Sequence, residues 1–121
     1  MELKKYQKRV ITDLREYLSH LEESKSLDQA FAAYWAGRGV TVGAGGVTRS
    51  QNVLEVVPNV CFKVPTGGGK TLLACASALP ILQAMPPTRH RAVVWLVPSD
   101  SILTQTLSAL RDTSHPYRRQ L

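Results

Sequence analysis

The sequence has few acidic residues in its second half, few cysteines and no long apolar run. Residues 56–121 hold seven basic and only two acidic side chains, a net charge of +5, whereas residues 1–55 carry +1. Cys61 and Cys75 both stand among apolar neighbours, which indicates buried thiols in a reducing compartment rather than a disulfide framework or a metal site. No apolar run approaches the roughly 18 residues that span a bilayer. The first residues lack the apolar core of a secretory signal, so we expect a cytoplasmic location.

The remaining composition indicates a small globular protein with a polyanionic partner. Its 121 residues are 44% hydrophobic, enough for one domain with one core. A net charge of +6 that lies mostly in the second half favours a nucleotide, and also nucleic acid, as ligands. On charge alone, a general solubility bias explains the excess equally well.

The most informative segment is residues 60–71, which read VCFKVPTGGGKT. An apolar run stops at Pro65, three glycines follow, and Lys70 and Thr71 open a new apolar segment. This is the order of a loop that wraps a nucleoside triphosphate with its backbone N–H groups, with the lysine at the β- and γ-phosphates and the threonine hydroxyl on Mg²⁺. One departure is Val64, which stands where the signature usually has glycine or alanine. The alternative is a glycine-rich turn with a solvated lysine.

Apolar periodicity and capping signals predict four helical regions. A helix is expected from about residue 3 to 23, with Tyr6 on its apolar face, and a second helix is expected to begin at the capping box Ser26–Gln29 and end at Gly37 and Gly39. A helix should also begin at the glycine loop and be ended or kinked by Pro80. A further helix should follow residue 99 or 100. Residues 38–58 are expected to form a flexible glycine-rich loop.

Two apolar runs predict strands. Residues 60–64 and 92–97 are short and almost uninterrupted, which is typical of strands buried in a parallel sheet. Alternation of strand and helix predicts an α/β fold containing a βαβ unit with a right-handed crossover.

Three patches together resemble superfamily 2 DEAD/DEAH-box helicases, and in particular the Res subunit of type III restriction enzymes. The patches are LKKYQ at residues 3–7, VPTGGGKT at residues 64–71 and WLVPS at residues 95–99, with HPYR at residues 115–118. The resemblance implies a partial RecA-like P-loop NTPase domain over residues 59–121, preceded by a helical segment over residues 1–37 and the loop 38–58. It also implies ATP and Mg²⁺ as cofactors, with duplex DNA and a methyltransferase or specificity subunit as partners.

The same resemblance assigns roles to individual residues. Gln7 would contact the adenine edge, because an amide pairs bidentately with adenine, while Tyr6 would either flank the base or belong to the core. Pro98 and Ser99 would lie near a nucleic-acid phosphate, although Ser99 also suits a simple helix cap. The phosphate and magnesium site would comprise Thr66, Gly67, Gly68, Gly69, Lys70 and Thr71. The tail residues His115, Tyr117, Arg118 and Arg119 would bind phosphate or form a solvated end.

After Thr71 the sequence has only two acidic residues, Asp100 and Asp112, and neither belongs to an Asp-Glu pair after an apolar run. That pair normally holds magnesium and orients water. An arginine finger, which alone contributes about 10³–10⁵ in rate, is also expected to be missing. We therefore expect a chain that binds ATP without efficient turnover, as a truncated form or one piece of a larger protein. Two rivals stay open: a non-motor P-loop phosphotransferase, and a catalytically inactive nucleic-acid-binding module.

Overall fold

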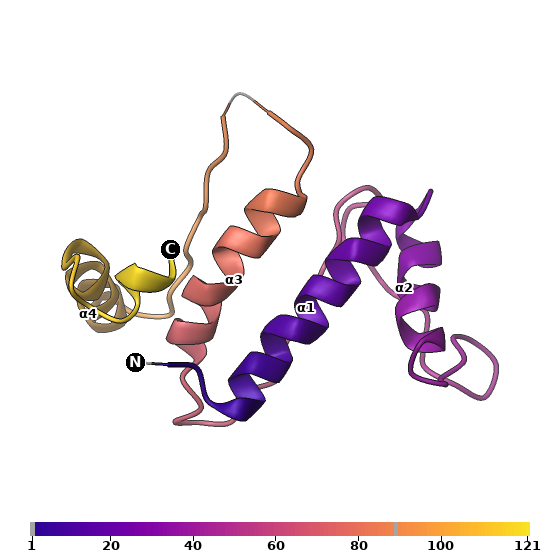
Figure 1. Ribbon diagram of the computed structural model, residues 1–121, viewed down its shortest axis with the longest axis horizontal. Coiled ribbons are helices and arrows are strands. Elements are labelled where there is room, and N and C mark those ends of the chain that lie inside the picture. The colour runs from indigo at the N-terminus through magenta and orange to yellow at the C-terminus, as the bar shows by residue number, and fades with distance from the viewer. Residues whose placement is uncertain (1, 89) are drawn as a thin grey trace. The chain divides into compact units, whose positions relative to one another are not determined.

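A computed structural model describes residues 2–88 and 90–121 of the chain, and the regular structure in these residues is helical (Figure 1). The elements, in chain order, are α1 (Lys5–Glu23), α2 (Leu27–Ala36), α3 (Lys70–Ala84), α4 (Asp100–Arg111) and the 3₁₀ helix η1 (Arg118–Gln120). The predicted helices are therefore confirmed.

The predicted α/β class is wrong, because the described residues contain no strand and no sheet. Both expected strands, 60–64 and 92–97, are extended but unpaired, and the sole bridge among the described residues joins Val42 to Val47. Most of their side chains are exposed; Val94 is 82% and Leu96 88% exposed. An apolar β-prone run becomes a strand only when a neighbouring strand supplies ladder hydrogen bonds and cross-strand contacts, and neither run has such a neighbour here. The βαβ unit and its crossover, and with them the partial RecA-like domain, are therefore not observed.

The chain divides into two compact units, and α1 contributes to both. The first unit comprises the residues up to Ile11 together with Val64–Leu121. Its core joins Ile11 of α1 to Leu73 and Ala76 of α3, with Val64 packed against them. This core holds the first turns of α1 beside the glycine loop that precedes α3.

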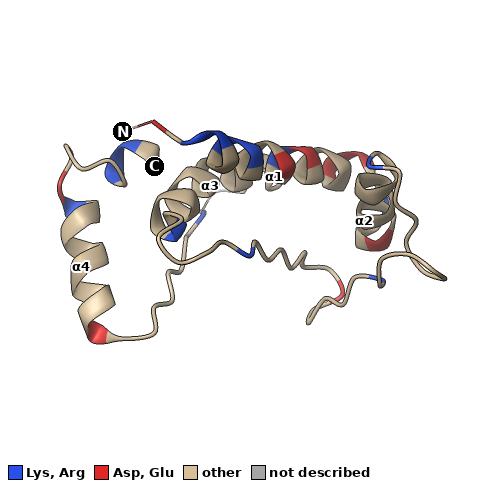
Figure 2. Cartoon of the chain, turned by 90° about the horizontal axis from the view of Figure 1, so that it is seen from below, with Lys and Arg blue, Asp and Glu red and all other residues tan. Residues whose placement is uncertain are grey.

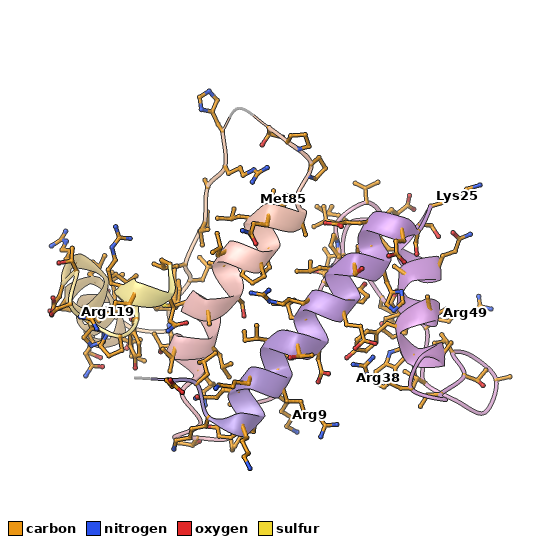
Figure 3. The ribbon with its side chains drawn as sticks, viewed as in Figure 1. Arg9, Lys25, Arg38, Arg49, Met85 and Arg119 are labelled. Atoms are coloured by element: carbon orange, nitrogen blue, oxygen red, sulfur yellow. The ribbon has the colours of Figure 1, made fainter. Side chains whose placement is uncertain are left out.

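The second unit, Thr12–Lys63, is organised around aromatic side chains and one arginine. The rings of Tyr17 and Tyr34 meet edge to face with centroids 5.6 Å apart. The Arg38 guanidinium lies 3.7 Å from the centroid of the Tyr34 ring and forms 2.9 Å ion pairs with Asp13 and Glu16 (Figure 3). Bidentate pairing and a stacked ring together fix the turn after α2 against α1.

The predicted cap at the start of α2 forms, although the reciprocal bond of the capping box goes to the residue before the cap. Ser26 is the N-cap, and its hydroxyl accepts a hydrogen bond from the backbone N–H of Gln29 at 3.3 Å. The Gln29 side chain accepts in return from the backbone N–H of Lys25 at 3.2 Å. Gly37 is the C-cap, as expected from the sequence.

Pro80 is predicted to end or kink its helix, and it does not end it, because α3 continues to Ala84 with Pro80 buried inside it. Proline removes one backbone hydrogen bond inside the helix. At the end of α3, the Arg91 guanidinium donates to the carbonyls of Leu82 and Met85. A cation that binds the last carbonyls of a helix also complements the helix dipole.

Candidate functional site

The glycine loop at residues 64–71 takes backbone conformations that require glycine. Gly67 and Gly69 have φ angles of +75° and +72°, a region that side chains strongly disfavour. The Gly68 N–H donates to the Pro65 carbonyl at 3.0 Å and closes a tight turn. Gly68 also has no room for a side chain, because an added Cβ would lie 2.6 Å from Cγ1 of Val64. The glycines therefore shape this loop.

The first turn of α1 is bonded to the loop through the Gly68 carbonyl. The Tyr6 hydroxyl donates to this oxygen at 2.8 Å, and Nε2 of Gln7 donates to it at 3.0 Å. The Lys4 N–H donates to Oε1 of Gln7 at 2.9 Å, so both ends of the amide have partners. Gln7 is only 4% exposed. The interpretation of Tyr6 as a core residue is wrong, since Tyr6 is 41% exposed and its hydroxyl contacts the loop.

Lys70 is the first residue of α3, with Gly69 as its N-cap. Its ammonium donates to the carbonyls of Val64 at 3.4 Å and Pro65 at 3.2 Å. Within the described part of the chain, no carboxylate forms an ion pair with Lys70. The lysine is exposed and its charge is balanced only by carbonyl dipoles, which leaves it suited to an anion.

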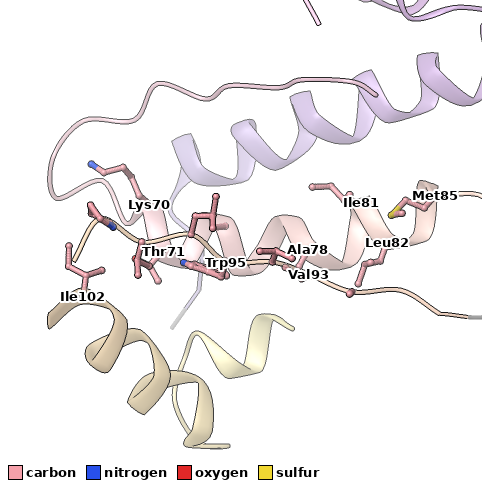
Figure 4. Close-up of a pocket in the computed structure, with 15 residues that line it drawn as sticks. Lys70, Thr71, Ala78, Ile81, Leu82, Met85, Val93, Trp95 and Ile102 are labelled. Atoms are coloured by element: carbon pink, nitrogen blue, oxygen red, sulfur yellow. The ribbon is translucent and has the colours of Figure 1, made fainter. Parts of the chain in front are cut away.

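An apolar groove begins at Lys70 and Thr71 and follows α3 toward Met85 (Figure 4). Its volume is about 630 Å³, and its other wall is the extended segment 92–98 with Trp95. This volume lies in the range of small-molecule sites, which are usually mostly apolar with a few polar groups at one end. Lys70 and Thr71 are the polar groups at this end.

Charge is unevenly distributed along α1. Figure 2 shows Lys and Arg on its first turns and Asp and Glu on its later turns. Lys5, Lys8 and Arg9 lie on the same turns as the residues that contact the loop. The basic end of α1 thus raises the positive potential around the loop.

Most of the other expected site residues are solvent-exposed. Pro98 and Ser99 both face solvent, and Ser99 is the N-cap of α4 without a side-chain capping bond, because its hydroxyl lies 3.1 Å from that of Ser101. In the tail, His115 is half-buried and its Nδ1 accepts from the Tyr117 N–H at 3.2 Å. Thr66, Arg118 and Arg119 are exposed.

The remaining titratable groups indicate structural roles. Burial raises the pKa of the Cys75 thiol, which is consistent with the buried thiol predicted from the sequence. Cys61, by contrast, is exposed, so that part of the prediction is wrong. Across residues 2–88 and 90–121, no three His, Cys, Asp or Glu side chains gather as metal ligands would. No helix in these residues is long and apolar enough to cross a membrane.

Sequence reasoning missed two features of the site. Ile11 is buried in the core that holds α1 beside the loop, although the predicted apolar face did not include it. The hydroxyl of Tyr6 and the amide of Gln7 share one loop carbonyl 61 to 62 positions away, and no local pattern indicates such a distant contact. The only hint of this contact in the sequence is that two side chains with hydrogen-bond donors, Tyr6 and Gln7, stand next to each other in the first turn of a helix.

The comparisons with known proteins identify the family. A glycine loop ahead of a helix with an exposed lysine has the local order that is typical of phosphate-binding loops. The family model described as "Type III restriction enzyme, res subunit" matches residues 1–120, and the chain belongs to this family, in its helicase-like domain. Searches of curated proteins and of solved structures each gave no match.

Proposed function

We propose that the chain binds ATP, with its phosphates at the loop 64–71 and the N-terminus of α3. The observation that carries the proposal is Lys70, an exposed cation that follows a left-handed glycine and is held only by carbonyl oxygens. Family membership supports it, because helicase-like domains use ATP and Mg²⁺.

The residues of the loop fit a phosphate chain. The first N–H groups of a helix have no intrahelical partner and carry the positive end of the helix dipole, so the first turn of α3 offers donors to an anion. Lys70 would exchange two neutral carbonyl partners for charged phosphate oxygens, a stronger kind of hydrogen bond. The hydroxyl of Thr71 would ligate Mg²⁺, which prefers oxygen ligands, and Thr66 would lie beside the phosphates. The magnesium ion supplies charge neutralisation at the phosphates when it is bound.

A second proposal concerns DNA. As a member of the Res-subunit family, the chain is proposed to contribute to ATP-dependent movement on duplex DNA, together with a methyltransferase or specificity subunit. The net charge of +6 supports a polyanionic partner. Pro98 and Ser99 are the proposed phosphate-backbone contacts, and their exposure leaves them accessible.

Calorimetric titration with ATP and Mg²⁺ tests the nucleotide site. Lys70→Ala should weaken binding by about 1.5–3 kcal/mol, the usual contribution of a hydrogen bond to a charged group, which corresponds to roughly 10- to 150-fold in Kd. Lys63→Ala is the matched control, because Lys63 is also exposed and precedes the loop. Equal affinity in the wild type and Lys70→Ala would refute the assignment.

A further inference from the structure

We propose that an aromatic pocket in the second unit binds a small organic cation with a methylated ammonium head group. The pocket is lined by residues of α1, α2 and the extended segment 59–62, and its volume is about 310 Å³. All of these residues belong to the unit Thr12–Lys63, so the pocket shares none of them with the glycine loop or with α3. The proposal is therefore independent of the proposed nucleotide site.

Aromatic rings form most of the pocket's wall. Tyr17 comes from α1, Phe31, Tyr34 and Trp35 come from α2, and Phe62 comes from the extended segment. The rings of Tyr17 and Tyr34 stand at 83° to each other, and those of Tyr34 and Trp35 at 85°. Rings at right angles border one space from several directions. The negative faces of aromatic rings attract cations, and a cage of such rings is the common way to bind a quaternary ammonium group.

One of these rings already binds a cation of the protein itself. The Arg38 guanidinium lies 3.7 Å from the centroid of the Tyr34 ring and forms ion pairs with Asp13 and Glu16. One positive and two negative side chains leave this cluster with a net charge of −1. Asp13 also lines the pocket, so a carboxylate and aromatic rings border the same space. This combination favours a cationic ligand.

The distribution of charge disfavours a nucleotide or another phosphate in this pocket. Residues 12–63 contain six acidic and five basic side chains, a net charge of −1, whereas the other residues contain three acidic and ten basic ones, a net charge of +7. Among the described residues that line the pocket there is no lysine or arginine. A phosphate would therefore lie beside the Asp13 carboxylate without a cationic partner. The volume is at the lower end of the range for ligand sites, about 300–1,000 Å³, which suits a small head group.

Nuclear magnetic resonance titration with choline tests the proposal. The matched probe is neohexyl alcohol, which has carbon in place of the charged nitrogen of choline and the same shape. The chain has two tryptophans, Trp35 in the pocket and Trp95 in the segment 92–98, so their indole N–H signals distinguish this pocket from the groove along α3. Nε1 of Trp35 is buried and has no hydrogen-bond partner among the described residues, which protects its proton from exchange with water.

Choline at constant ionic strength should shift the Trp35 signal, with saturation in the millimolar range, and leave the Trp95 signal unchanged. Neohexyl alcohol should bind about tenfold more weakly, because it lacks the cation–π attraction to two or more rings. Equal affinity for the two probes would show that the pocket is merely apolar and would overturn the proposal. A shift of Trp95 as large as that of Trp35, or no saturable shift of Trp35, would also overturn it.

A variant pair tests the aromatic wall. Phe62→Leu removes one ring from a segment without regular structure, where Phe62 is 39% exposed, so the helix content in circular dichroism should stay unchanged. Tyr117→Leu is the control, because it removes a ring that contacts His115 outside the pocket. Loss of one cation–π contact should weaken choline binding about two- to fivefold in Phe62→Leu and leave it unchanged in the control. Wild-type affinity for choline in a folded Phe62→Leu protein would contradict the cage.

Discussion

Replacing Gly69 and Gly67 separately by alanine isolates the contact between the loop and α1. Both residues have a positive φ, +72° and +75°, so both variants place a side chain in the left-handed region. That conformation costs about 1–2 kcal/mol, of which about 0.4–1 kcal/mol is offset because alanine restricts the unfolded chain. The two positions differ in their surroundings. An added Cβ meets nothing within 4 Å at Gly67, but at Gly69 it lies 2.5 Å from Nε2 of Gln7.

The buried amide must therefore move in Gly69→Ala, and its hydrogen bond to the Gly68 carbonyl is lost. A buried polar group left without its partner costs about 1–3 kcal/mol. We expect Gly67→Ala to lose about 1 kcal/mol of unfolding free energy and Gly69→Ala about 1–3 kcal/mol more. Urea denaturation followed by far-ultraviolet circular dichroism measures both. Equal losses in the two variants would show that Gln7 does not hold the loop, and would refute the reasoning.

Two further predictions concern Arg38 and the exposed segment 93–97. Arg38→Lys keeps the charge but loses the bidentate geometry, so it should lower the urea midpoint at pH 7. The hydrogen bond from Arg38 holds the pKa of Glu16 in the folded protein below its usual value. The contribution of this pair to stability is therefore present above the pKa of Glu16 in the unfolded chain, and it is lost as the pH falls through the lowered pKa of the folded protein. The deficit of the variant should therefore shrink below about pH 4, near the ordinary pKa of a glutamate, and a deficit constant to pH 2 would contradict the pairing. The wild type should self-associate through its unpaired apolar segment, and Leu96→Lys should reduce association more than Val53→Lys, an equally exposed control, in sedimentation experiments. A wild type that stays monomeric at high concentration would contradict this.

Local signals in the sequence predicted the helices well. The capping box at Ser26 fixes the start of α2, because hydroxyl and N–H partners three residues apart meet in any helix. Periodicity located α1, although the buried face includes Gln7 and Ile11 and leaves Tyr6 exposed. A polar residue on a buried face is invisible to a hydrophobicity pattern, since its burial depends on a partner elsewhere in the chain.

The strands could not be predicted correctly for a related reason. Residues 92–97 have the composition of a buried strand, but a strand is stabilised by its neighbours and not by its own residues. The runs at 60–64 and 92–97 have no ladder partner among the described residues, so they stay extended. The end of α3 likewise has a partner from further along the chain, because Arg91 donates to the carbonyls of Leu82 and Met85.

The candidate site combines both kinds of information. Residues 64–71 encode their own shape, since Gly67 and Gly69 allow the positive φ angles and Lys70 opens the helix. The orientation of the Gly68 peptide depends instead on Tyr6 and Gln7, more than 60 positions earlier. The motif therefore identifies the residues of the proposed phosphate site, whereas the contact from α1 holds the loop from outside. Preorganisation of a loop raises affinity by lowering the cost of ordering it on binding, so the first turn of α1 belongs to the proposed nucleotide site together with the glycines.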